Sequence, residues 1–91
     1  MDVSTQLHEA LNRRRLFIDA VRSSDLRAGE KLRLRLAYSI PSAREAINDF
    51  VVEKLMEKGD PATMADGTII AIIIEYLPEI LALIQIIIGL F

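Results

Sequence analysis

Two glutamates and a glutamine interrupt the most apolar stretch of the sequence, the last 24 residues, TIIAIIIEYLPEILALIQIIIGLF. On a helix built from residues 68–91, Glu75, Glu79 and Gln85 fall near one face, because positions three or four apart share a face. We call these three residues the polar seam. Carboxylates in apolar surroundings could line a lumen for protons or cations if several copies formed a pore. The alternative is a stripe that faces water or lipid headgroups.

Basic residues form the second group that could bind a ligand, because arginine pairs with phosphate. Residues 13–35 contain eight basic and three acidic residues, which gives a local net charge of +5. The candidate anion-binding residues are Arg13, Arg14, Arg15, Arg22, Arg33 and Arg35. Anionic lipid headgroups would suit them, and an ordinary solvated face with intrahelical ion pairs is the alternative. The lack of a stacking platform of aromatic residues or a Cys/His zinc pattern argues against nucleic acid.

The sequence gives no support for catalysis. His8 is the single histidine, cysteine is absent, and no glycine-rich phosphate loop or metal-ligand spacing occurs. A chain of 91 residues is also small for a pocket that excludes water. We therefore expect no enzymatic activity, no cofactor and no bound metal.

Charge divides the chain into two regions of different solvent preference. All eleven lysines and arginines precede Gly59, whereas the rest of the chain carries only four acidic residues. The prediction is a polar, basic-biased helical region at 1–58, a turn-rich linker at 59–67 and an apolar helix at 68–91. The length allows one small domain at most.

Apolar spacing predicts an all-α fold, with three short amphipathic helices before the linker. The first covers residues 4–23, where Leu7, Leu11, Ile18 and Val21 fall near one face. The third covers residues 42–58, with a capping box over Ser42-Ala-Arg-Glu and a C-terminal cap at Gly59. Its predicted apolar face consists of Ala43, Ala46, Ile47, Phe50, Val51 and Leu55.

The segment KLRLRLAY at residues 31–38 fits two structures. Leucine alternates with arginine, as in a half-buried strand, but no second strand pattern occurs to pair with it. Leu32, Leu36 and Ile40 also fit a short helix. We favour a helix over residues 30–39, and a strand would require a partner from another chain. Pro41 places Ile40 outside the helical region in either case.

Pro78 lies inside the apolar C-terminal segment. In a continuous helix it removes the hydrogen bond to the Ile74 carbonyl and kinks the axis. The alternative is a pair of short helices, 69–76 and 79–90, with Pro78 at the start of the second. We expect a kinked helix.

Three settings could bury the apolar surface of this helix. A helix of 24 residues is about 36 Å long, which is enough to span a bilayer. The favourable insertion of its apolar residues is nearly cancelled by its two carboxylates, so a lone span would be marginal. Burial in a homo-oligomer or larger assembly is the second setting, and burial by the chain's own helices is the third. The residues assigned to this oligomer or membrane face are Ile69, Ile70, Ile73, Ile74, Leu77, Ile80, Leu81, Ile84, Ile87, Ile88 and Phe91.

These patterns favour a structural or interaction protein that self-associates or is anchored through its C-terminal helix, such as a subunit of a virion or a membrane assembly. A holin-like pore with Glu75 and Glu79 in its lumen is the first alternative, and a soluble helical bundle that binds a protein partner is the second. The first residues lack the apolar run of a secretory signal peptide. If the last helix spans a membrane, Lys54 and Lys58 would keep its N-terminal side in the cytoplasm.

Overall fold

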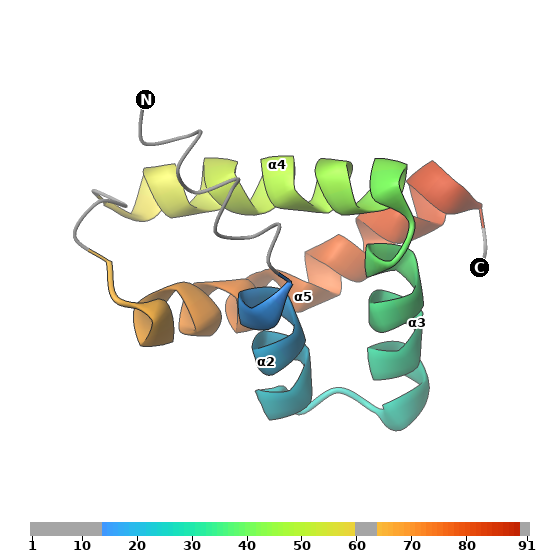
Figure 1. The fold of residues 1–91 in the computed structure, drawn as a ribbon, viewed down its shortest axis with the longest axis horizontal. Helices are drawn as coiled ribbons and strands as arrows, with labels where there is room; N and C mark the ends of the chain where they lie inside the picture. The colour runs from blue at the N-terminus through green and yellow to red at the C-terminus, as the bar shows by residue number, and fades with distance from the viewer. Residues whose placement is uncertain (1–13, 60–63, 90–91) are drawn as a thin grey trace.

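The computed structural model describes residues 14–59 and 64–89, and within these ranges every regular element is an α-helix. The helices are α2 (Arg15–Ser23), α3 (Ala28–Tyr38), α4 (Pro41–Lys58) and α5 (Asp66–Ile88). Figure 1 shows α4 above α5. The two short helices α2 and α3 lie side by side and run crosswise to these two long helices. The all-α prediction and the long apolar C-terminal helix are confirmed.

The N-terminal boundary of α2 differs from the prediction. Arg14 precedes the helix with a φ of 68° and a ψ of −21°, which is the left-handed region. A residue in that conformation cannot continue a right-handed helix, so the predicted helix over 4–23 is wrong at this point. Residues 4–13, with Leu7 and Leu11, lie outside the described residues.

Helix α3 settles the ambiguity of KLRLRLAY in favour of the helix. Successive leucines two positions apart point in directions about 200° apart on a helix, so they fall on opposite faces. Leu34 and Tyr38 are therefore buried, whereas Leu32 and Leu36 are 54% and 55% exposed. The helix begins two residues earlier than predicted, and the backbone N–H of Arg27 donates to Glu30 Oε1 at 3.1 Å.

Helix α4 begins at Pro41 rather than Ser42. Ile40 is the N-cap residue in an extended conformation, as expected before a proline, and no side chain caps this end. The predicted capping box at Ser42 is therefore wrong, because proline at the first helical position already starts the helix. The other end agrees with the prediction: the helix stops at Lys58, and Gly59 is the C-cap residue.

The core lies between α5 and the other three helices. Phe17 and Val21 of α2, Tyr38 of α3 and Ile47 of α4 are buried together with one face of α5. Asn48 is also buried, and its side-chain oxygen accepts a hydrogen bond from the Tyr38 hydroxyl at 2.7 Å. This bond satisfies a polar group that would otherwise be costly to bury.

Helix α5 begins at Asp66, two residues before the predicted start, and it continues through Pro78 to Ile88. The alternative of two separate short helices is therefore wrong. Gly89 follows in the left-handed conformation, with a φ of 65°, and its N–H bonds to the Gln85 carbonyl. That is a common way to end a helix with glycine.

Candidate functional site

One face of α5 is buried by the chain's own helices. The buried residues follow each other at spacings of four, four, three and four, so they form a single stripe. They are Ile69, Ile73, Leu77, Ile80 and Ile84, all at most 5% exposed. This stripe contains five of the eleven residues of the predicted oligomer or membrane face, and it is buried inside the bundle.

The rest of the predicted face is divided between half-buried and exposed positions. Half-buried residues packed against the core are Ile70, Ile74, Leu81 and Ile88. Ile87 is 41% exposed, and Phe91 lies outside the described residues. Ile86, which the sequence analysis did not single out, is 82% exposed. The apolar surface that α5 leaves uncovered is thus concentrated in its last turn.

The polar seam lies on the solvent side of α5. Glu75, Glu79 and Gln85 are all exposed, which fits their common face. Glu75 accepts a hydrogen bond from Lys58 Nζ at 3.4 Å, and this carboxylate raises the pKa of Lys58. In this arrangement the seam meets water and a lysine of α4.

An aromatic and basic cluster joins α4 to α5 beside the seam. The Phe50 and Tyr76 rings meet edge to face, with centroids 6.1 Å apart. Lys54 Nζ lies 5.3 Å from the Phe50 centroid and 5.6 Å from that of Tyr76, which is cation–π distance. Sequence spacing gives no sign of this cluster, because its members come from two helices joined only through the linker.

The candidate anion-binding arginines do not converge on one point. Arg15 Nη2 forms an ion pair with Asp66 Oδ2 at 2.6 Å. Arg14 is the N-cap residue of α2, and Arg22 lies in the last turn of the same helix. Arg33 and Arg35 lie on α3, and Arg13 is outside the described residues. A single phosphate site made from all six is therefore not present in the described part of the chain.

Two surface cavities occur near α3. One, of about 370 Å³, is lined by Arg27, Gly29, Glu30 and Arg33. Glu30 places a carboxylate in this cavity, which weakens its attraction for an anion.

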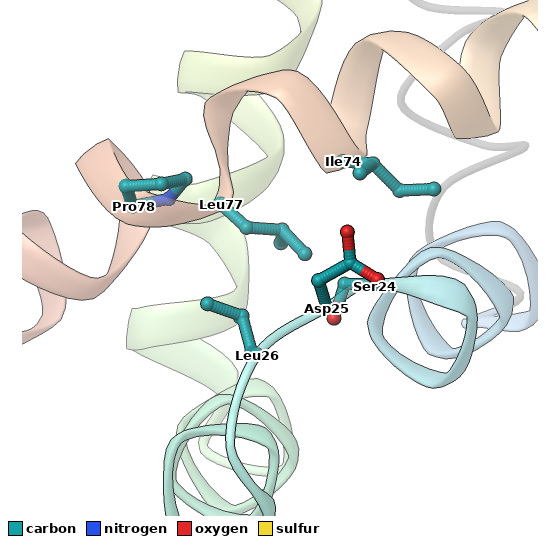
Figure 2. Close-up of a pocket in the computed structure, with 6 residues that line it drawn as sticks. All are labelled: Ser24, Asp25, Leu26, Ile74, Leu77 and Pro78. Atoms are coloured by element: carbon teal, nitrogen blue, oxygen red, sulfur yellow. The ribbon is translucent and has the colours of Figure 1, made fainter.

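The other cavity, of about 250 Å³, lies where the α2–α3 connection meets α5. Figure 2 shows Leu77 extending from α5 toward the Asp25 carboxylate, with Leu26 below it on the α2–α3 connection and Pro78 at the far edge. The Ser24 hydroxyl is occupied, since it donates to the Val21 carbonyl at 2.7 Å. The cavity offers an apolar wall and one carboxylate, without a nucleophile and base in contact.

Within residues 14–59 and 64–89, no group of three or more metal-binding side chains occurs. Helix α5 is the one candidate membrane span found in that part of the chain, by its length and apolar composition. The core helix of a water-soluble protein passes the same test, so this is weak evidence for a membrane.

Comparisons with models of protein families, with curated proteins and with solved structures found no match.

Proposed function

We propose that this is a small non-enzymatic interaction protein, which self-associates or is anchored in a larger assembly through the C-terminal end of α5. The observation that carries the proposal is the contrast along α5. Ile73, Ile80 and Ile84 are fully buried, whereas Ile86 is 82% exposed. Burying one such side chain in a partner would contribute about 2 kcal/mol.

Helix α5 is packed against the rest of the bundle over most of its length, which limits the surface that it can offer to a partner. Its buried stripe packs against α2, α3 and α4, and exposed ion pairs join Asp66 to Arg15 and Glu75 to Lys58. Full insertion of α5 in a bilayer would require these contacts to break. We therefore assign the association to the last turn, which needs no such rearrangement.

Size-exclusion chromatography with light scattering and flotation with liposomes test the proposal on the full chain. The test variant is Ile86→Glu, which places a charge at the exposed position. The matched control is Met56→Glu, at an apolar residue of α4 that is 53% exposed. Since neither side chain is buried, both variants should keep the helical content of the parent.

We expect the parent to run as a larger particle or to float with lipid, the Ile86→Glu variant to be released as a monomer, and the control to follow the parent. A parent that is monomeric and stays out of the lipid fraction would contradict the proposal. If the Met56→Glu variant lost self-association or lipid binding to the same extent, that would also contradict the proposal, because the loss would then not be specific to α5.

A further inference from the structure

Helix α3 carries two apolar stripes on opposite faces, and the bundle uses only one of them. Leu34, Ala37 and Tyr38 face the core. Leu32 and Leu36, one helical turn apart, point outward, and Ile40 extends the same line with 37% exposure. Leu32, Leu36 and Ile40 together form a contiguous apolar line on the exposed side of α3, and such a patch indicates a partner for this face.

Basic side chains border the outward stripe. At about 100° per residue, Arg33 falls on one side of the Leu32–Leu36 line and Arg35 on the other. Within Ala28–Tyr38 the charged residues are Glu30, Lys31, Arg33 and Arg35, which gives a net charge of +2. An apolar stripe between arginines is typical of helices that lie in the headgroup region of anionic membranes.

Helix α3 and the last turn of α5 lie at the same end of the long axis (Figure 1). Among residues 14–59 and 64–89, six large apolar residues are exposed, and five of them belong to α3, to the α3–α4 connection or to the last turn of α5: Leu32, Leu36, Ile40, Ile86 and Ile87. The sixth, Met56, lies near the end of α4, which Figure 1 shows at the opposite end. Within the described part of the chain, most large exposed apolar residues thus belong to the two helices that meet at this end.

We propose that the outward face of α3, centred on Leu32 and Leu36 and bordered by Arg33 and Arg35, docks on an anionic lipid bilayer surface. The inference rests on the proposed anchoring function, because it names the surface to which the chain is anchored. The leucines would enter the acyl boundary while the arginines pair with lipid phosphates.

Charge favours a bilayer over a second copy of the chain on this face. If two α3 helices paired through Leu32 and Leu36, the bordering arginines of one copy would lie near those of the other. The repulsion between these like charges would oppose the association of two copies. An anionic lipid surface meets the same residues with opposite charge.

Flotation of the full chain with two kinds of vesicle tests this inference. One contains phosphatidylcholine alone, and the other contains phosphatidylcholine mixed with phosphatidylglycerol. The variants are Leu32→Gln with Leu36→Gln, and Arg35→Gln, with Met56→Gln as the matched control. Circular dichroism establishes that each variant is folded, and chromatography without lipid reports self-association separately.

We expect the parent to bind the mixed vesicles and to lose that binding as salt rises from about 0.1 M to about 1 M, where screening shortens the Debye length to about 3 Å. The Arg35→Gln variant should bind about fivefold more weakly. The double leucine variant should bind about tenfold more weakly or not at all, and the control should bind like the parent.

Three results would overturn the inference. The first is a parent that binds neither vesicle, even if it self-associates through Ile86, a result that would leave the proposed function standing. The second is a double leucine variant that floats like the parent. The third is a double leucine variant that loses self-association in the absence of lipid, which would make a second copy the occupant of this face.

Discussion

Phe17 and Tyr38 stack in the core with ring centroids 4.2 Å apart and ring planes inclined by 11°. The pair joins α2 to α3, and both rings are at most 1% exposed. The Tyr38 hydroxyl reaches on to Asn48, so one side chain connects three helices. Two large rings and a satisfied hydrogen bond make this contact a principal support of the N-terminal half of the bundle.

Alkaline pH should weaken the fold through Tyr38. Burial raises the pKa of Tyr38 from 10.0 to about 12, because a buried phenolate is poorly solvated. The folded pKa lies above the unfolded one, so this stabilisation is complete below pH 10 and is lost as the pH rises toward 12. The loss should be about 2–3 kcal/mol in the free energy of unfolding. Urea titrations at several pH values measure it.

The Tyr38→Phe variant is the control for this pH dependence. It keeps the stacked ring but loses the hydroxyl and its bond to Asn48, so it should be less stable than the parent by about 1–2 kcal/mol at neutral pH. The difference between the two proteins should shrink above pH 10 and change sign as the pH approaches 12, because the parent loses more than its initial advantage. A constant difference up to pH 12 would show that Tyr38 does not titrate as described.

The periodicity of the sequence predicted the helices better than it predicted their faces. Alternation over Leu32, Leu34, Leu36 and Tyr38 is compatible with a strand, and on a helix it supports two opposite faces equally. The buried face was fixed by contacts that come from elsewhere in the chain, chiefly Phe17 stacking on Tyr38. Local spacing contains no information about such a partner.

The burial of Asn48 could not be predicted for a related reason. A polar residue at that position normally indicates the solvent side of a helix, and the hydrogen bond from the Tyr38 hydroxyl, ten residues away, helps to make its burial acceptable. At α5, by contrast, the predicted seam of Glu75, Glu79 and Gln85 is exposed, because its spacing follows the helical period. The spacing of residues in the sequence could not predict how much of the opposite face of α5 is covered by α2, α3 and α4.

Truncation of Ile73 should reveal that α5 belongs to the core. Ile73 is fully buried, so Ile73→Ala should lower the free energy of unfolding by about 2–5 kcal/mol. The matched control is Ile86→Ala, on the same helix but 82% exposed, which should change it by about 0.5 kcal/mol or less. Denaturation in urea at equal protein concentrations gives both values. Similar small effects of the two substitutions would mean that α5 is not packed in the bundle in solution.

The ion pair between Arg15 and Asp66 should contribute little to stability despite its short distance of 2.6 Å. Both side chains are more than half exposed, so water and salt screen their attraction. A double-mutant cycle with Arg15→Gln and Asp66→Asn should give a coupling free energy close to the error of the measurement, and smaller again in high salt. A large coupling that resists salt would instead indicate a pair shielded from water.

Replacing Pro78 should stabilise the bundle. The proline lies inside α5, where it cannot donate a hydrogen bond to the Ile74 carbonyl, and its own side chain is exposed. Alanine would restore the donor without removing a buried contact, so Pro78→Ala should raise the free energy of unfolding by about 1–3 kcal/mol. Ala82→Gly, at another exposed position of α5, is the control and should lower it by about 1 kcal/mol. If Pro78→Ala is neutral or destabilising, the contacts that the proline ring makes at the edge of the cavity lined by Leu26 and Leu77 outweigh the missing hydrogen bond.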